Sequence, residues 1–288
     1  MTTPVVERPS RPLVAPRPGR LSLTADVWRR RIAIGVVMAY AALLILAPLA
    51  ALVVGALSEG VRASLAALSQ PDLLAAFWRT IYIALITVGV HVVCGTAVAW
   101  VIVRHRFPGR RLLNGLLDLP FAVSPVVVGY MLLLIFGRTG VLGPALSALG
   151  WRVAFAMPGM ILATLFVTLP FMARELIPVL EEFGVEQEQA AATLGASSWQ
   201  TFWLVTFPAL RWGFVYGIVL TFARALGEFG AVLVVGGGVQ GQTETATLYI
   251  FRALDQRQYV GAYSAALVLG LISLALVVGS DFFHRKEK

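Results

Sequence analysis

The chain alternates between long apolar runs and short polar segments. A helix of about 20 apolar residues crosses a bilayer, and every one of these runs is at least that long. We therefore predict an all-α, polytopic membrane protein with six transmembrane helices. The runs cover residues 32–57, 77–103, 112–136, 159–180, 212–235 and 259–283.

Prolines lie inside several of the predicted spans. Pro48 is expected to kink the first, Pro120 and Pro125 to interrupt the third, and Pro170 to break the fourth. Neighbouring helices can satisfy the backbone groups that a proline frees within a membrane. The prolines therefore change the expected shape of the spans but not their number.

Composition supports a membrane protein. The 288 residues are 58% hydrophobic and 13% charged, whereas soluble domains are about 25% charged. The net charge of +8 comes from Lys and Arg residues that flank the apolar runs without an aromatic-interleaved patch, which argues against nucleic-acid binding. The single cysteine, Cys94, lies within an apolar run, so neither a disulfide nor a cysteine metal site can be built.

The distribution of basic residues predicts the orientation in the membrane. Sixteen Lys and Arg residues fall on the side that holds both termini, six fall on the other side, and Arg224 lies inside a span. Because the cytoplasmic loops of membrane proteins carry an excess of Lys and Arg, both termini are predicted to be cytoplasmic. The expected organisation is a disordered cytoplasmic tail at 1–27, a six-helix transmembrane domain at 28–283 and a short cytoplasmic tail at 284–288. The first run is too long for the core of a signal peptide.

The segment at 185–208 is too polar to be buried in the membrane. Four carboxylates crowd at and just before its start, a short helix is predicted up to about residue 194, and Gly195 suits the left-handed position that ends a helix. Ser197 and Gln200 have the spacing of a capping box, which predicts a second helix. Trp199, Phe202 and Trp203 fall on one face of that helix. We interpret the segment as a helix–turn–helix loop that needs a protein partner.

The spacing in this loop resembles the "EAA–x3–G–x9–I–x–L–P" loop of the permeases of bacterial ABC importers. Ala190, Ala191, Gly195 and Pro208 match, whereas Gln189 stands where the family usually has Glu, and Glu188 lies one position early. In the family this loop is the coupling element that fits a groove of the ATPase subunit. The resemblance therefore implies the same role for Gln189, Ala190, Ala191, Gly195 and Pro208.

Two charges are predicted inside the fifth span. Arg224 and Glu228 are four residues apart and so share a helix face with Thr221 and Ala225. Charged groups at that depth are costly and are usually paired. Two hypotheses remain open and can coexist. In one, an internal ion pair locks helix packing; in the other, Arg224 adds positive potential to an anion path that Glu228 tunes or gates.

Three further strings narrow the resemblance to oxyanion importers. RALGEFGA at 224–231 is similar to a segment of sulfate and molybdate permeases, while DLPFAVSPVV at 118–127, beginning at Asp118, and MARELIP at 172–178 resemble the sulfate/thiosulfate branch. The resemblance implies a type I ABC importer permease in a bacterial inner membrane, in contact with lipid. Its implied partners are an ATPase dimer, a second homologous permease and an extracytoplasmic sulfate-binding protein. That binding protein is expected to meet the outer loops at 137–158 and 236–257.

Chemistry of its own is not expected in this chain. Its two lysines, Lys286 and Lys288, do not follow a P-loop pattern, and the triplet at 236–238 is interpreted as a flexible external loop. The three histidines are scattered, so neither a metal site nor a catalytic triad is predicted. The chain is thus expected to be no enzyme and to hold no cofactor, with ATP and Mg bound by the partner ATPase. The alternatives are a molybdate or tungstate permease, an ion-driven secondary transporter and an intramembrane enzyme.

Overall fold

The computed structural model describes residues 20–285, with side chains described over 27–280 and at Phe282. These residues divide into two compact units, one ending at Ala51 and the other beginning at Leu52. The first unit holds most of helix α1 (Arg20–Ala56). Every other described helix belongs to the second unit.

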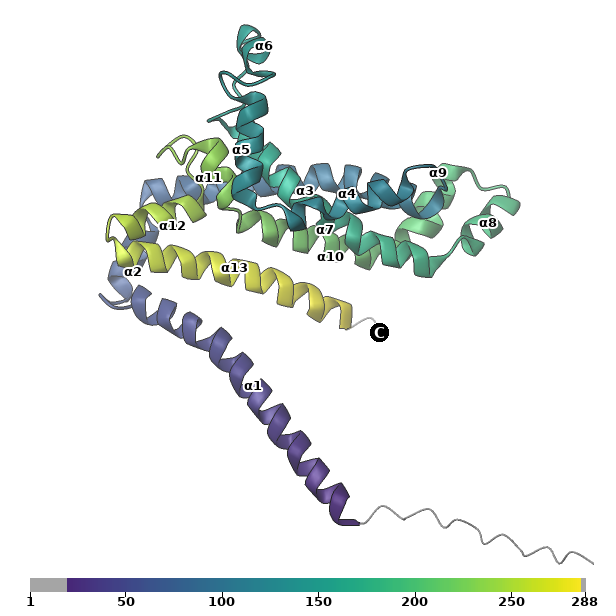
Figure 1. Ribbon diagram of the computed structural model, residues 1–288, viewed down its shortest axis with the longest axis horizontal. Helices are drawn as coiled ribbons and strands as arrows, with labels where there is room; N and C mark the ends of the chain where they lie inside the picture. Colours follow the sequence, from purple (N-terminus) through teal and green to yellow (C-terminus); the bar gives the residue numbers. More distant parts are fainter. Residues whose placement is uncertain (1–19, 286–288) are drawn as a thin grey trace, which may run out of the picture. The chain divides into compact units, whose positions relative to one another are not determined.

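All regular structure in the described residues is helical (Figure 1). After α1, the elements are α2 (Val61–Leu68), α3 (Pro71–Arg104), α4 (Arg110–Ala122), α5 (Pro125–Phe136), α6 (Gly143–Ala148), α7 (Met157–Phe183), α8 (Glu186–Thr193), α9 (Ser198–Thr201), the π-helix η1 (Phe202–Thr206), α10 (Phe207–Leu226), α11 (Gly230–Gly236), α12 (Ala246–Asp255) and α13 (Tyr259–Arg285). The all-α prediction is confirmed.

Five of the described helices are long and apolar enough to cross a membrane, and α4 with α5 makes a sixth span if the pair is counted as one. The interruption predicted at Pro125 in the third span is confirmed, because the chain bends by 109° between α4 and α5. Pro125 begins α5, and a proline keeps the residue before it out of the helical region. Ser124 is accordingly extended, with ψ 135°.

Pro120 and Pro170 have less effect than predicted. Pro120 lies inside α4, and α7 continues through Pro170, so the expected break in the fourth span is wrong. Pro48 lies inside α1, and the kink expected there stays a prediction.

The fifth span ends earlier than its apolar run. α10 stops at Leu226, and α11 begins only at Gly230, so the continuous helix predicted over 212–235 is wrong. Glu228 lies in the break between them. The change of direction allows α11 to pack against α5.

The segment predicted as a tail overlaps the first described helix. α1 begins at Arg20, within the range 1–27 that was expected to be disordered. Residues 1–19 and 286–288 lie outside the described residues, and α13 extends to Arg285. The predicted division at 28 and 283 stays a prediction.

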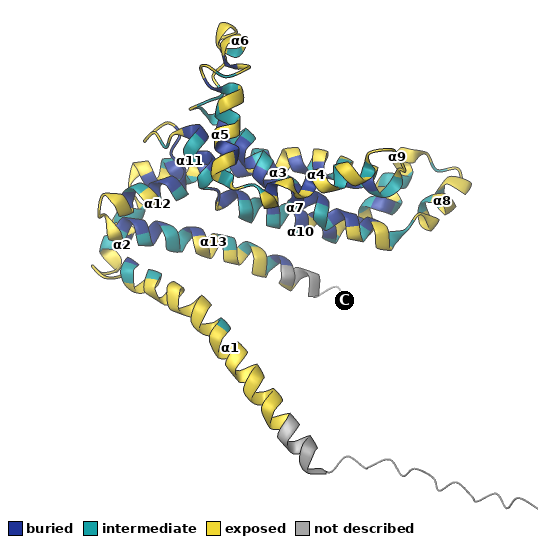
Figure 2. Cartoon of the chain, in the orientation of Figure 1, coloured by how far each residue is buried: buried dark blue, intermediate teal, exposed yellow. Residues whose placement is uncertain are grey.

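The core of the second unit lies between α3, α7 and α10, which pack against one another (Figure 1). Small residues permit the close approach that is typical of helices in membranes. A Cβ at Gly95 of α3 would lie 2.9 Å from Cβ of Met172, and one at Gly217 of α10 would lie 2.5 Å from Sδ of Met172. Figure 2 shows buried residues along the facing sides of these helices. At one end of this bundle lie α8 and α9, and at the other lie α2 and α12.

Candidate functional site

The turn between α8 and α9 is fixed by its backbone. Gly195 has φ +86°, a conformation that side chains rarely adopt. The amide of Ala196 donates to the carbonyl of Ala191 and that of Gly195 donates to Ala192, each over 3.0 Å. These two bonds are the Schellman motif that ends helices at a glycine. The left-handed turn predicted at Gly195 is confirmed.

The second half of the loop begins with the predicted capping box. The Ser197 amide donates to Oε1 of Gln200 over 2.8 Å, and the Gln200 amide donates to Oγ of Ser197 over 3.3 Å. Both bonds satisfy amides at the start of a helix that would otherwise lack partners. The turn and the cap together hold α8 and α9 in a defined hairpin.

The helix that follows does not end at Pro208. α9 passes through the π-helix η1 into α10, where Pro208 occupies the first turn, a position that tolerates proline. The expectation that Pro208 closes the loop is therefore wrong. The loop is joined to α10 by continuous helix, so a rotation of the loop can be transmitted to that span.

Apolar side chains are exposed on this hairpin. Trp199 is 71% exposed and packs edge-on against Trp203, which is also exposed. Leu194, beside the glycine turn, is 89% exposed. Phe202 instead turns toward Trp100 of α3, with ring centroids 6.0 Å apart. The predicted aromatic stripe thus has two outward members and one that contacts the bundle.

Residues of the motif that resembles the ABC-importer loop are exposed on α8. Gln189 and Ala190 on α8 are exposed, and Ala191 is partly exposed. In α8 and α9 the ion pair is made by Glu188, whose Oε1 lies 2.9 Å from Nη2 of Arg104. The sequence marked Glu188 only as an offset motif residue, and its partner lies 84 residues away in the chain.

Arg224 and Glu228 form an ion pair. Nη1 of Arg224 lies 2.8 Å from Oε2 of Glu228, without hydrogen-bond geometry. The Glu228 side chain is 2% exposed, while that of Arg224 is 31% exposed. Oε1 of Glu228 accepts from the amide of Ala231 over 3.1 Å, so the carboxylate also caps the start of α11.

The two residues are not placed as predicted on one face of a continuous helix. Arg224 lies in the last turn of α10, which ends at Leu226, and Glu228 follows in the break. Thr221 and Ala225, expected on the same face, are buried. Arg224 therefore reaches outward while its neighbours on α10 point into the core.

Asp118 and Arg174 join the two strings that resemble sulfate permeases. Nε of Arg174 donates to Oδ1 of Asp118 over 2.9 Å, and Nη2 donates to Oδ2 over 2.6 Å. The same guanidinium donates to the side chain and the carbonyl of Asn114, each over 3.0 Å. Arg174 thus ties α4 to α7. The sequence analysis did not predict this pair, whose members are 56 residues apart.

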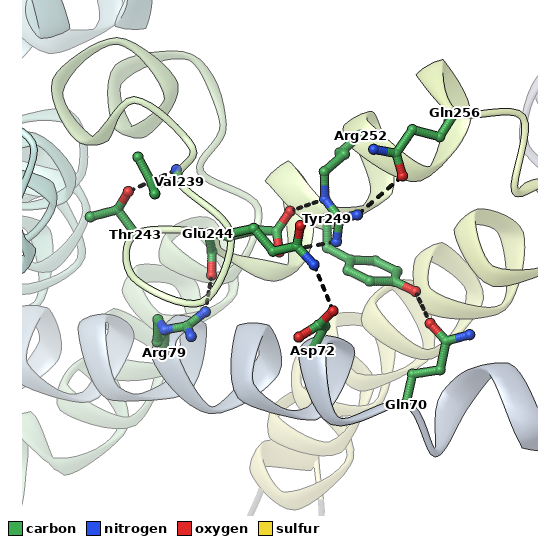
Figure 3. A network of polar contacts seen from close by, with 10 residues as sticks. Gln70, Asp72, Arg79, Val239, Thr243, Glu244, Tyr249, Arg252 and Gln256 are labelled. Carbon is green, nitrogen blue, oxygen red and sulfur yellow. Dashed lines mark hydrogen bonds and ion pairs between the residues drawn. The ribbon is translucent and has the colours of Figure 1, made fainter.

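A polar network joins the start of α3 to α12 (Figure 3), at the end of the bundle opposite α8 and α9 (Figure 1). Nε of Arg252 lies 2.5 Å from Oε1 of the buried Glu244, and Nη1 of Arg79 donates to the Glu244 carbonyl over 2.9 Å. The Tyr249 hydroxyl donates to Oε1 of Gln70 over 3.0 Å. Burial raises the pKa of Tyr249, and the hydrogen bond to Glu244 raises that of Arg252.

This network corrects the expectation of a loop over 236–257. Thr243, Glu244 and Thr245 are buried, and α12 follows them directly. Two contacts with α3 hold the segment: Nη1 of Arg79 donates to the Glu244 carbonyl, and the Thr80 hydroxyl accepts from the Ala246 amide over 2.8 Å.

Among the side chains that the structure describes, no group of three or more His, Cys, Asp and Glu residues could hold a metal ion. His91 is buried in α3, and its Nε2 lies 3.0 Å from Oγ1 of Thr168 on α7.

Comparisons with known proteins agree on the class. Residues 91–286 match the family model described as the binding-protein-dependent transport system inner membrane component. The sulfate transport system permease protein CysW of Synechococcus elongatus is 48% identical over 245 residues, which cover 85% of this chain and 86% of that relative. CysW of Escherichia coli K12 is 46% identical over 247 residues, which cover 86% of this chain and 85% of that relative. Sulfate permease 2, chloroplastic, of Chlamydomonas reinhardtii is 45% identical over 256 residues, covering 89% and 69%.

Solved structures share the fold. A bacterial ABC transporter that imports the acidic polysaccharide alginate superposes with a TM-score of 0.71 at 18% identity, covering 92% of this chain and 99% of that chain. The bacterial alginate ABC transporter in complex with an alginate pentasaccharide-bound periplasmic protein superposes with a TM-score of 0.70 at 18% identity. The match covers 91% of this chain and 96% of that chain.

The bent and broken helices around α3, α7 and α10, with a hairpin at one end, have the fold of an ABC importer's membrane part, and the family match makes the chain a permease subunit. The chain belongs to the family of binding-protein-dependent transport system inner membrane components, and it is an integral membrane protein of that family. The resemblance to the sulfate/thiosulfate branch is confirmed by the CysW relatives.

Proposed function

We propose that this chain is the membrane-spanning permease of an ATP-driven importer that carries sulfate, or thiosulfate, into the cell. The observation that carries the proposal is the 48% identity, over 85% of the chain, to a protein named as a sulfate transport permease. The structure is compatible with it. A coupling hairpin lies at one end of the bundle, and Arg224 supplies a positive charge part-way along the bundle.

ATP hydrolysis belongs to a partner in this proposal. The exposed apolar side chains of Leu194, Trp199 and Trp203 fit a groove on an ATPase dimer, which would bind ATP and Mg. The coupling residues are Gln189, Ala190, Ala191, Gly195 and Pro208. Closure of the dimer would push the hairpin, and the continuous helix through η1 would transmit the movement to α10. Alternating access of the path follows from that movement.

Arg224 marks the side of α10 that faces the path. Its guanidinium is 31% exposed near the end of a membrane-spanning helix, and a charge facing lipid at that depth is costly. This side therefore faces the second permease or the water-filled path between the two subunits. There Arg224 attracts a dianion, and the buried Glu228 holds the guanidinium in place and limits how tightly the anion binds.

The remaining assignments follow from the orientation. With both termini and the hairpin in the cytoplasm, the network around Glu244 lies at the outer end of the bundle. An external sulfate-binding protein would deliver the anion there, over the segments at 137–158 and 236–257. α6 and α12 lie within these segments and supply ordered surface.

Uptake of labelled sulfate by cells tests the substrate. Cells that lack this gene should fail to take up sulfate and to grow on it, a plasmid copy should restore both, and growth on cysteine should be unaffected throughout. Intact sulfate uptake with loss of molybdate-dependent enzyme activity would instead identify a molybdate or tungstate permease. Uptake that persists without ATP and stops when the ion gradient is collapsed would identify a secondary transporter.

A further inference from the structure

Arg104, the last residue of α3, contacts two other helices, α7 and α8. Its Nη1 donates to the carbonyl of Leu180 on α7 over 3.2 Å, and its Nη2 donates to Oε1 of Glu188 on α8 over 2.9 Å. The guanidinium also lies 5.6 Å from the ring centroid of Trp100. The Arg104 and Glu188 side chains are only 8% and 15% exposed. This pair is therefore shielded from water, and a change in either charge leaves the other without its partner.

Glu188 extends the contact to the far side of the hairpin. The same Oε1 accepts from Oγ1 of Thr206 over 3.0 Å, and Thr206 is fully buried in η1. The π-helix is a rare conformation that occurs frequently at functional sites. One carboxylate thus joins α8, the end of α3 and the segment that leads into α10.

We propose that Arg104, Glu188 and Thr206 form a clamp that makes α3 move with the coupling hairpin. The chain itself attaches the hairpin only to α7 and α10, and this clamp adds α3. The proposal rests on the coupling role given above. In it, Glu188 is a positioning residue that acts within the permease, and the exposed Gln189 and Leu194 are left to contact the ATPase.

The competing assignment is that Glu188 pairs with a basic residue of the ATPase. That pairing would require Glu188 to move away from Arg104. The buried guanidinium of Arg104, whose Nε already lacks a hydrogen-bond partner, would then lose its carboxylate as well. The two assignments differ in their effects. Loss of a clamp uncouples hydrolysis from transport, whereas loss of a contact with the ATPase weakens assembly.

The test uses the complete importer in proteoliposomes and measures labelled sulfate transported per ATP hydrolysed. A purely structural defect lowers the number of active complexes but leaves this ratio unchanged. A lower ratio therefore reports a loss of coupling between hydrolysis and transport. Arg104→Gln and Glu188→Gln should each lower the ratio by about ten-fold, and the double variant should be no worse than either one. The ATPase should co-purify normally with all three. Glu186→Gln, on the exposed part of α8, is the matched control and should keep the wild-type ratio.

A milder variant keeps the test informative if the charge variants fold poorly. Thr206→Val removes one hydroxyl at nearly constant volume and should lower the ratio by about two-fold. Wild-type ratios in the Arg104 and Glu188 variants, or additive effects in the double variant, would overturn the clamp. Loss of ATPase co-purification in Glu188→Gln but not in Arg104→Gln would overturn it in favour of the competing assignment.

Failure of the coupling role itself has a different signature. Gly195→Val distorts the hairpin turn without touching the clamp residues. If that variant retains the ATPase and a normal ratio, the coupling role is wrong whatever the clamp variants show.

Discussion

Gly195 is the residue where the sequence predicted local structure most directly. Its spacing from Ala190 and Ala191, and the capping box two residues later, depend only on contacts between near neighbours, so a short stretch of sequence contains all the information. The Arg104–Glu188 and Asp118–Arg174 pairs could not be predicted in this way. Their partners are 84 and 56 residues apart and meet only because α3 and α4 pack against α7.

The first prediction concerns this turn. Gly195→Val should leave the protein in the membrane but abolish ATPase co-purification and sulfate uptake. A left-handed conformation costs a residue with a side chain about 1–2 kcal/mol, and valine is among the least tolerant. A Cβ at this position meets no atom within 4 Å, so the effect is one of backbone conformation and not of crowding. Gly195→Asn is the matched control and should retain function, because asparagine adopts this conformation readily. Equal behaviour of the two variants would contradict the assignment.

The second prediction concerns Arg224 and Glu228. Arg224→Ala or Glu228→Ala alone should destabilise the protein more than the double variant does, because one removal leaves an uncompensated charge, at a cost of about 3 kcal/mol or more when that charge is buried. Thermal stability in detergent would measure this. Glu228→Gln separates the two contacts, since its amide oxygen can still accept from Ala231 while the charge is lost.

Additive losses in the Arg224 and Glu228 variants would contradict the pairing. A double variant that assembles normally but does not transport sulfate would show that the pair acts on the anion as well as on packing.

At the scale of elements, the sequence predicted the number of spans and the interruption at Pro125, but not the break at Glu228. An apolar run reports the surrounding solvent and not the direction of the helix, so the break at Glu228 was hidden within a continuous apolar run. α12 was missed because it lies in a polar segment. Glu244, just before it, is buried with hydrogen-bond partners on α3 and at Arg252, and those contacts are not visible in local sequence.

The third prediction tests how α12 is held to the start of α3. Tyr249→Phe removes the hydroxyl that donates to Gln70 and should lower the free energy of unfolding by about 1 kcal/mol near neutral pH. Burial raises the pKa of Tyr249 in the folded state, so the protonated form is favoured there. The wild-type protein should therefore lose stability as the pH rises beyond about 10, and the variant should lose less.

Denaturation measured from neutral to alkaline pH checks the Tyr249 prediction. The difference in free energy of unfolding between wild type and variant should become smaller as the pH rises. A gap that widens above pH 10 would show that the hydroxyl is not held in its neutral form. Tyr259→Phe, at an exposed tyrosine at the start of α13, is the matched control.

At the scale of the whole molecule, the chain belongs to a family of inner membrane components of transport systems. Two of its surfaces have features that need partners. The hairpin exposes Leu194 and Trp199, and α10 presents a partly exposed guanidinium within a span. The ABC-importer class was predictable because its coupling loop is a local pattern. The proposed substrate, sulfate, rests on the resemblance to sulfate permeases.

The central claim is that ATP hydrolysis by a partner drives sulfate inward through this permease. Its most direct test is the complete importer in proteoliposomes, with the binding protein and labelled sulfate on one side and ATP on the other. We predict that sulfate accumulates inside only when ATP and the binding protein are both present, and that excess unlabelled molybdate has little effect. Accumulation without ATP, or accumulation of molybdate with none of sulfate, would contradict the account.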